Sequence, residues 1–110
     1  MKFPFGQEIY NKTPAPLVNL KELISWFRLK RFNGLLMGET SNIITEILVY
    51  DGKIPKAFTE GNGEVLAEDC SAIEIFVNDY LARVGSLSLF SYDKELITPI
   101  LILYFSTPNI

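Results

Sequence analysis

The chain has 110 residues, of which 48% are hydrophobic and 13% aromatic, and its formal net charge is −3. This composition excludes the intrinsically disordered class, and the length suits one domain, residues 1–110, with a single modest core. The negative charge argues against a nucleic-acid-binding surface, which normally carries a clustered basic excess.

The first element in chain order is an extended N-terminal arm, residues 1–16, in which two of the three prolines exclude a helix. We expect a short edge strand within it. Leu20 to Leu29 is the best-marked helix, because Asn19 can cap it and Glu22 completes a capping-box spacing. Its buried stripe consists of apolar side chains at helical spacing: Leu20, Leu23, Ile24 and Phe27.

Three basic residues, Arg28, Lys30 and Arg31, close this helix. They fit a basic patch for phosphate or an anionic membrane, with Trp26 as an interfacial anchor. They also fit a simpler interpretation, in which the cations complement the negative end of the helix dipole. We favour this second interpretation.

A strand over Phe32 to Gly38 leads into a hairpin from Ile43 to Thr59, closed by Asp51-Gly52. Asp-Gly between apolar alternating runs is among the strongest short-range hairpin signals. A two-residue loop places Ile47, Val49, Ile54 and Phe58 on one face, which we expect to face the core, while the half-polar opposite face is expected to be partly covered. Pro55 cannot donate to the ladder, so we expect a wider loop or a bulge.

The second half begins with a loop at Glu60 to Gly63, followed by a mostly helical stretch from Glu64 to Val84 whose start is ambiguous. Asp69 or Ser71 could cap this helix, and an alternative start lies near Asn62. Its apolar stripe predicts a buried, unreactive Cys70, and Gly85 is expected to end it as a C′ residue. The stripe consists of Cys70, Ile73, Phe76, Val77, Tyr80, Leu81 and Val84.

Ser86 to Tyr92 alternates and predicts another strand, after which Asp93 can cap residues 94–105. Pro99 must kink or restart a helix there, and the apolar run Ile100 to Phe105 fits a buried strand as well as a helix. Taken together, the elements predict an α+β domain, with an antiparallel meander sheet of four or so strands packed against two or three helices.

The sequence contains no histidine and one cysteine. The commonest general base and the usual transition-metal ligand are therefore missing, and we expect no catalytic residue, no cofactor and no metal site. The concentrated carboxylates could hold a divalent cation, but their spacing misses the calcium-loop pattern. They are Glu60, Glu64, Glu68 and Asp69. The pair Gly61-x-Gly63 lacks the rest of a phosphate-binding fingerprint, and a plain loop is the better interpretation.

A single cysteine excludes an intrachain disulfide, which fits a reducing compartment. The N-terminus lacks the apolar core of a signal peptide, and the run Ile100 to Phe105 is too short to span a bilayer. We therefore expect a cytoplasmic protein without a membrane or nucleic-acid partner. Residues 1–60 carry eight Lys/Arg against six Asp/Glu, and residues 61–110 carry two against seven, so the halves can attract each other or a partner.

The order of motifs resembles PATAN-type domains over roughly residues 17–96. A helix precedes Phe32-Asn33-Gly34-Leu35, and a strand ends in Leu48-Val49-Tyr50-Asp51-Gly52-Lys53-Ile54. Lys56-Ala57, a glycine-bearing loop, a helix containing Ala72 and Gly85-Ser86-Leu87 follow. The chain is also similar to small archaeal domains of unknown function with a strand, Asp-Gly, Lys-Ile-x-x-Ala core, although Pro55 departs from the pattern. The resemblance implies a signalling-associated interaction module and supplies no catalytic residue.

We therefore expect a non-catalytic protein–protein interaction or regulatory module, which an exposed apolar patch would favour. The alternative is a small-ligand binding domain with a pocket between sheet and helices near Trp26 and Tyr80, which a pocket with convergent polar groups would favour. An enzyme using carboxylates and a metal is the third hypothesis.

The uncharged apolar run near the C-terminus is aggregation-prone if it is exposed, so we predict that part of it is buried in a homodimer or a partner interface. The candidate interface residues are Ile100, Leu101, Leu103 and Phe105.

Overall fold

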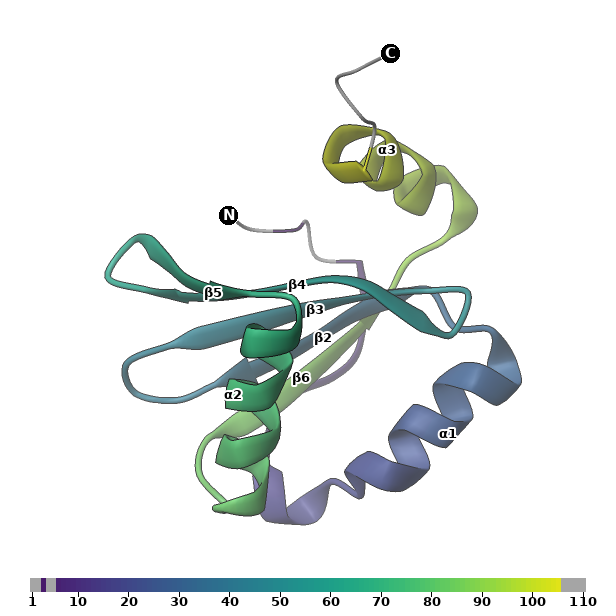
Figure 1. Cartoon of the computed structure of the whole chain (residues 1–110). Coiled ribbons are helices and arrows are strands. Elements are labelled where there is room, and N and C mark those ends of the chain that lie inside the picture. Colours follow the sequence, from purple (N-terminus) through teal and green to yellow (C-terminus); the bar gives the residue numbers. More distant parts are fainter. Residues whose placement is uncertain (1–2, 4–5, 106–110) are drawn as a thin grey trace.

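The computed structural model describes residue 3 and residues 6–105, apart from the side chains of residues 94, 101 and 103–105. A six-stranded antiparallel sheet with the strand order β1-β6-β2-β3-β4-β5 forms its centre. Helices α1 and α2 lie on one face of the sheet, and α3 lies on the other (Figure 1). The predicted α+β class is confirmed, although the sheet has six strands where four or so were expected.

The elements in chain order are β1 (Gln7–Pro14), the 3-10 helix η1 (Ala15–Leu17), α1 (Leu20–Lys30), β2 (Gly34–Glu39), β3 (Ile44–Tyr50), β4 (Lys53–Gly61), β5 (Glu64–Glu68), α2 (Cys70–Leu81), β6 (Ser86–Ser91) and α3 (Lys94–Phe105).

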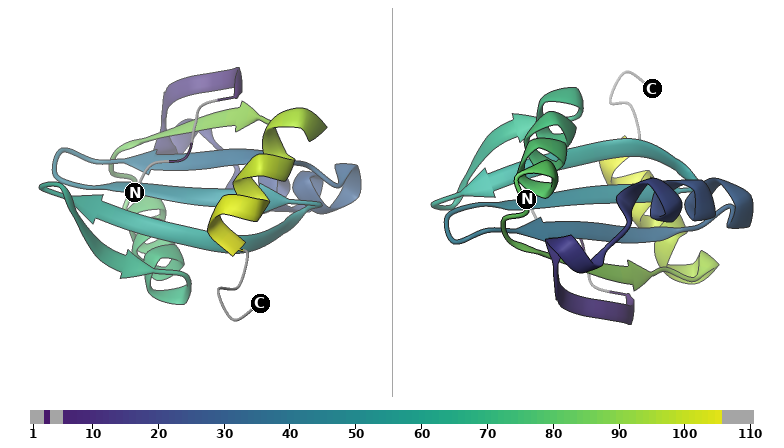
Figure 2. Two further views of the ribbon diagram at one scale, coloured as in Figure 1. Left: turned by 90° about the horizontal axis from the view of Figure 1, so that it is seen from above. Right: turned by 90° about the horizontal axis from the view of Figure 1, so that it is seen from below.

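Strands β2 to β5 form a meander in which each strand is antiparallel to the next. After α2, strand β6 returns to pair with β2, and β1 pairs with the outer side of β6. The first and last strands in the sequence are therefore neighbours in space (Figure 2). The edge strand expected in the N-terminal arm is present as β1.

The β3–β4 hairpin contains the expected irregularity at Pro55. Tyr50 pairs with Lys53 and Leu48 with Lys56, so one residue of β3 faces two residues of β4 between these pairs. Pro55 lies in this bulge, where a strand tolerates a residue without an N–H group. Of the two alternatives for Pro55, the bulge is the one that the structure adopts.

The bulge changes which face of the sheet the side chains of β4 occupy. Ile47 and Val49 lie in the core under α1 and α2, whereas Phe58 lies in the core under α3. The prediction that Phe58 shares their face is therefore wrong, because one extra residue turns the following side chains to the opposite face. The half-polar face is covered as expected, since Leu48 is fully buried.

Residues 64–68 form strand β5 and not the start of a helix. Asn62 and Gly63 have φ values of 53° and 77°, so they close a second two-residue hairpin between β4 and β5. The expected loop from Glu60 to Gly63 is therefore shorter, a turn at Asn62 and Gly63, because residues 60 and 61 belong to β4. The alternative helix start near Asn62 is wrong, because β4 offers residues 64–68 a partner strand, and Asp69, one of the two expected caps, is the N-cap residue. Helix α2 begins only at Cys70.

Helix α2 buries its middle and exposes both ends. Phe76 and Ala72 are buried, while Cys70 at the first position and Leu81 at the last position are exposed. The expected burial of Cys70 is wrong, because Ala72 and not Cys70 occupies the sheet-facing position in the first turn. Because Cys70 is exposed, we expect a thiol reagent to label it rapidly in the native protein.

The end of α2 also differs from expectation. Arg83 adopts a left-handed φ of 61°, and the Val84 amide donates to the Asp79 carbonyl at 3.1 Å. This is a Schellman motif with arginine in the place where glycine is usual. Gly85, with a φ of 80°, follows the motif and leads into β6, so it is not the C′ residue.

The C-terminal segment forms a helix, α3, and not a buried strand, and this helix includes Pro99. The Asp93 carboxylate accepts a hydrogen bond from the Leu96 amide at 2.8 Å, which confirms the predicted cap. Ile97 and Ile100 are buried against the sheet.

The sheet is covered by a separate apolar cluster on each face. The cluster under α1 and α2 contains Ala15, Phe27, Phe32, Leu36, Ile47, Val49, Ala57, Ala72, Phe76, Leu87 and Leu89. The cluster under α3 contains Phe3, Leu35, Leu48, Phe58, Phe90, Tyr92, Ile97 and Ile100. This double cover explains why β2 and β3 contain continuous apolar runs.

Replacing Gly52 by alanine tests the turn against a matched glycine. Gly52 and Gly63 have nearly the same positive φ, 76° and 77°, but a Cβ at Gly52 would lie 2.7 Å from the Phe27 carbonyl oxygen, whereas a Cβ at Gly63 meets nothing. We expect Gly63→Ala to destabilise by about 1 kcal/mol through the backbone conformation alone, and Gly52→Ala to cost distinctly more. Urea unfolding measures both, and equal losses would contradict the close approach of the turn to α1.

Candidate functional site

The tip of the β3–β4 hairpin lies on the last turn of α1. The Phe32 amide donates to the Phe27 carbonyl at 3.0 Å, and the Gly52 amide donates to the Phe32 carbonyl at 2.9 Å. Gly52 is buried there, and its missing side chain lets the turn approach the helix backbone. Two segments separated by about twenty residues are thus held in one fixed arrangement.

An ion pair between Arg31 and Asp51 spans this junction. Both residues have left-handed backbones, with φ values of 51° and 52°. The Arg31 Nε donates to Asp51 Oδ1 at 2.6 Å and its Nη2 donates to Oδ2 at 3.1 Å, which is the bidentate geometry that suits a guanidinium. This pair lowers the pKa of the Asp51 carboxyl and raises that of Arg31, chiefly through the side-chain hydrogen bond.

The backbone of Asp51 is held as well. Its amide donates to the Asn33 side-chain oxygen at 2.8 Å, and the Asn33 carbonyl accepts from the Tyr92 amide at 2.8 Å. Asn33 therefore ties the turn to the segment that enters α3.

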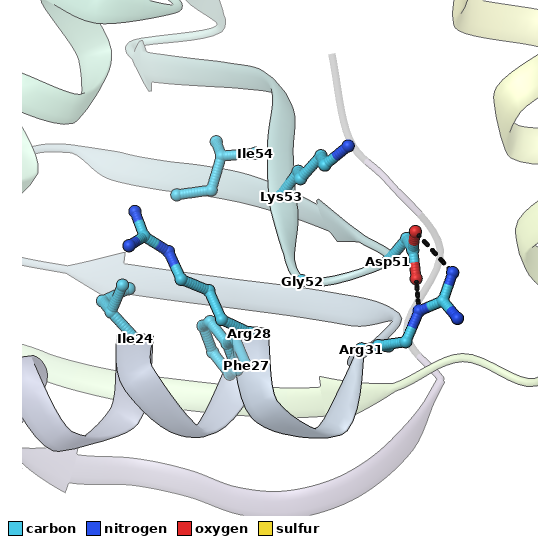
Figure 3. A pocket seen from close by; sticks show the side chains of 8 residues that line it. All are labelled: Ile24, Phe27, Arg28, Arg31, Asp51, Gly52, Lys53 and Ile54. Atoms are coloured by element: carbon cyan, nitrogen blue, oxygen red, sulfur yellow. Dashed lines mark hydrogen bonds and ion pairs between the residues drawn. The ribbon is translucent and has the colours of Figure 1, made fainter.

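A half-open pocket of ≈ 650 Å³ lies between α1 and β4 beside this junction (Figure 3). We call it the hairpin pocket. Buried Phe27 and partly buried Ile24 and Ile54 supply its apolar surface. Arg28 extends from α1 toward Ile54, whereas Arg31 turns away to Asp51 (Figure 3). The lining residues are Ile24, Phe27, Arg28, Arg31, Asp51, Gly52, Lys53 and Ile54.

Three cationic side chains and one carboxylate line the hairpin pocket, in a chain whose net charge is −3. Asp51 pairs with Arg31 and leaves Arg28 and Lys53. Neither of these two side chains makes a hydrogen bond or an ion pair with another residue that the structure describes, although the charge of Lys53 helps to lower the pKa of Asp51. Lys53 points to the other side of β4, whereas Arg28 lies over the apolar surface (Figure 3). The pocket therefore combines an apolar surface with one cation, Arg28, that no carboxylate among the described residues pairs with.

A second pocket of ≈ 470 Å³ lies on the other side of the ion pair. Arg31 and Asp51 line both pockets, and Asn33, Tyr50, Ile97 and Thr98 complete the second one. The ion pair is thus the partition between a pocket under α1 and a pocket beside α3.

The basic residues predicted at the end of α1 separate in the structure. Arg28 and Lys30 lie in the last helical turn, where they suit the helix dipole, while Arg31 belongs to the ion pair. The sequence interpretation missed Lys53 and Ile54 as site residues. The only available signal was a lysine and an isoleucine directly after Asp-Gly, which also fits an ordinary strand.

The pocket expected near Trp26 and Tyr80 is not the hairpin pocket. The Trp26 ring packs against Phe32, with centroids 5.1 Å apart. The Tyr80 hydroxyl donates to the Val18 carbonyl and accepts from the Leu20 amide at 3.1 Å. Both side chains therefore support the packing of helices, and neither lines the hairpin pocket.

A different surface lies at the opposite end of α1, where η1 meets the end of α2. Leu17 is 75% exposed and Leu81 is 70% exposed, and Pro16 shares with Leu81 a shallow depression of ≈ 220 Å³. We call Pro16, Leu17 and Leu81 the end patch. The hydrogen bonds of Tyr80 and one from the Ala15 amide to the Gly85 carbonyl hold its elements together.

The concentrated carboxylates do not form a metal site in the described part of the chain. Asp69 forms an ion pair with Lys56 at 3.2 Å, and its other oxygen accepts from the Ala57 amide at 3.3 Å. No three His, Cys, Asp or Glu side chains among the described residues lie close enough to hold a metal ion.

Of the four candidate interface residues near the C-terminus, only Ile100 has a side chain that the structure describes. Ile100 is buried against the sheet of its own chain, and the adjacent Ile102 is exposed. The side chains of Leu101, Leu103 and Phe105 lie outside the described residues, so their role in an interface stays a prediction.

Comparisons with protein-family models, with curated proteins and with solved structures found no match. None of the helices in the described residues is long and apolar enough to cross a membrane.

Asp51→Asn isolates the charge of the ion pair, because asparagine suits the left-handed turn equally well. The pKa of Asp51 is lowered in the folded protein, so the ion pair stabilises the fold above the unfolded pKa of about 3.9 and this contribution disappears as the pH falls through the folded pKa. We expect Asp51→Asn to be less stable than the wild type at neutral pH, and the difference to shrink toward about pH 3. Urea unfolding over this range measures it.

The control is Glu74→Gln, which removes an exposed carboxylate from the middle of α2. Its stability relative to the wild type is expected to stay nearly constant over the same pH range. An Asp51→Asn difference that is equally constant would show that the ion pair does not contribute to folding.

Proposed function

We propose that this chain is a non-catalytic ligand-binding domain and that the hairpin pocket is its binding site. The observation that carries this proposal is Arg28, a cation that extends over the apolar surface of the pocket and whose side chain has no hydrogen-bond or ion-pair partner among the described residues (Figure 3). Small-molecule sites typically combine an apolar lining with a few polar groups, in volumes of roughly 300–1,000 Å³. The volume of ≈ 650 Å³ lies within this range.

The pocket is built on rigid elements, which supports a pre-formed site. Its walls come from α1, the Asp51-Gly52 turn and β4, and backbone hydrogen bonds at 2.9 and 3.0 Å join the helix end to the turn. A binding site whose walls are fixed before the ligand arrives loses little conformational entropy on binding.

The non-catalytic part of the proposal is supported by the state of the groups in the pocket. Its one carboxylate, Asp51, has a lowered pKa because Arg31 holds it in a bidentate pair, so it is a weak base near neutral pH. The guanidinium of Arg28 can donate hydrogen bonds to an anion and has no acceptor atom, so it suits binding and not proton abstraction.

Filling the pocket tests this proposal. Arg28 is an exposed helix residue whose side chain extends over the pocket, so Arg28→Trp should occupy the space without disturbing the core (Figure 3). A fragment library screened by amide chemical shifts should give ligands that perturb residues 24–31 and 51–54 in the wild type and lose at least about tenfold in affinity in Arg28→Trp.

Lys30→Trp is the matched control, because it replaces another exposed cation of α1 outside the pocket lining. It should bind the same fragments as the wild type. If no fragment perturbs the pocket residues, or if Arg28→Trp binds as well as Lys30→Trp, the hairpin pocket is not the binding site.

We propose protein–protein interaction through the end patch as the second candidate function. Two largely exposed leucines, Leu17 and Leu81, favour it, because exposed apolar clusters commonly mark contact surfaces. Arg83 lies beside Leu81 and lines the same depression, so a partner with an apolar side chain next to a carboxylate would complement the surface.

Leu81→Glu tests the end patch, with Leu29→Glu as the control. Leu29 is 78% exposed on α1 and lies away from the patch, so both variants add one charge at an exposed helical leucine. Affinity capture from the native organism followed by mass spectrometry should identify a protein retained by the wild type and Leu29→Glu and lost by Leu81→Glu. Identical sets of captured proteins would contradict this second function.

A further inference from the structure

We infer that the ligand of the hairpin pocket is a small organic anion, in which an apolar body carries one carboxylate or phosphate group. The inference rests on the proposed ligand-binding function and specifies the chemistry of the ligand.

The anionic group follows from the arrangement of charge. Arg31 is already neutralised by Asp51, so a second anion placed against Arg31 would meet the Asp51 carboxylate. Lys53 points to the other side of β4, and its charge acts on Asp51 (Figure 3). Arg28 has no hydrogen-bond or ion-pair partner for its side chain among the described residues, and it extends over the apolar surface toward Ile54 (Figure 3). An anion placed against Arg28 gains a charge-assisted contact and keeps the Arg31–Asp51 ion pair intact.

The negative end of the α1 dipole does not oppose this arrangement strongly, because the carbonyl groups nearest the pocket are already occupied. The Phe27 oxygen accepts from the Phe32 amide at 3.0 Å, and the Arg28 oxygen accepts from the Arg31 amide at 3.3 Å. Occupied carbonyl groups carry less of the partial charge that makes a helix C-terminus attract cations.

The apolar body follows from the remainder of the lining. Ile24, Phe27 and Ile54 form an apolar surface beside the cation, and a volume of ≈ 650 Å³ far exceeds what a bare phosphate ion fills. An inorganic anion would leave this surface in contact with water, whereas an aromatic or aliphatic group attached to the anion would cover it.

An extended polyanion does not fit the same surface. The chain carries a net charge of −3, and the continuous basic stripe that tracks a nucleic-acid backbone is absent from its sequence. The one cation over the apolar surface suits one anionic group.

The test is a titration of the full chain with four probes, followed through amide chemical shifts. Naphthoate and naphthyl phosphate carry both an apolar body and an anion, inorganic phosphate carries only the anion, and naphthalenemethanol carries only the apolar body. We expect at least one of the two organic anions to shift the amides of Arg28, Lys53 and Ile54, and to bind at least about tenfold more tightly than either single-feature probe.

The Arg28→Glu variant should lose at least about tenfold in affinity for the organic anion, because the contact becomes repulsive. Lys30→Glu is the control, since it changes the net charge equally at an exposed cation of α1 outside the pocket lining. Circular dichroism melts establish that both variants are folded, and Arg28→Gln, which removes the charge alone, is used if Arg28→Glu fails to fold.

Equal binding by Arg28→Glu and Lys30→Glu would overturn the inference, as would tighter binding of naphthalenemethanol or inorganic phosphate than of the organic anions. If the neutral probe occupies the pocket and the anions do not, the proposed ligand-binding function stands and only the ligand class is wrong. If none of the four probes perturbs the pocket residues, the ligand class is again overturned, and the fragment screen decides the function separately.

Discussion

The close approach of the Asp51-Gly52 turn to the end of α1 is the constraint on which the rest of the structure depends. A Cβ at Gly52 would lie 2.7 Å from the Phe27 carbonyl oxygen, so only glycine lets the two backbones meet without rearrangement. Once they meet, the Gly52 amide closes on the Phe32 carbonyl, and Arg31 and Asp51 come within reach of each other. The position of the helix, the shape of the hairpin pocket and the partition between the two pockets all follow from this contact.

A second constraint is that the sheet must be covered on both faces. Leu35, Leu36, Leu48 and Val49 are all fully buried, so each face needs its own layer. Helices α1 and α2 cover one face, and α3 covers part of the other (Figure 2). Among the polar groups buried in these layers, the hydroxyl groups of Thr45 and Thr59 lie 2.9 Å apart and Glu46 accepts from the Phe3 amide at 3.3 Å, whereas the Tyr10 hydroxyl has no hydrogen-bond partner among the described residues. The two edge strands, β1 and β5, are both irregular, which disfavours pairing with another sheet.

The candidate site could be predicted only in part, because its residues come from separate segments. Arg28 and Arg31 were recognisable as a basic cluster at a helix end, and Asp51-Gly52 as a turn. Nothing in the local pattern of either segment indicates that they touch. Lys53 carries no distinguishing signal, since a lysine after Asp-Gly is ordinary in a hairpin. A binding site that is assembled across about twenty residues of sequence is invisible to reasoning that uses only local periodicity.

The sequence by itself determined the local structure wherever short-range chemistry decides it. Asn19 and Asp93 cap their helices, Asp-Gly closes its hairpin, and helical spacing marks the core face of α1, because each of these signals acts within a few residues. Only the tertiary structure decided the rest. Residues 64–68 became a strand because β4 offered a partner, and Cys70 was exposed because Ala72 faces the sheet. Pro55 indicated a wider loop or a bulge, but the pairing of β3 with β4 decided between them and so set the face of Phe58. In the first two cases a contact with another segment outweighed a local preference worth at most about 1 kcal/mol per residue.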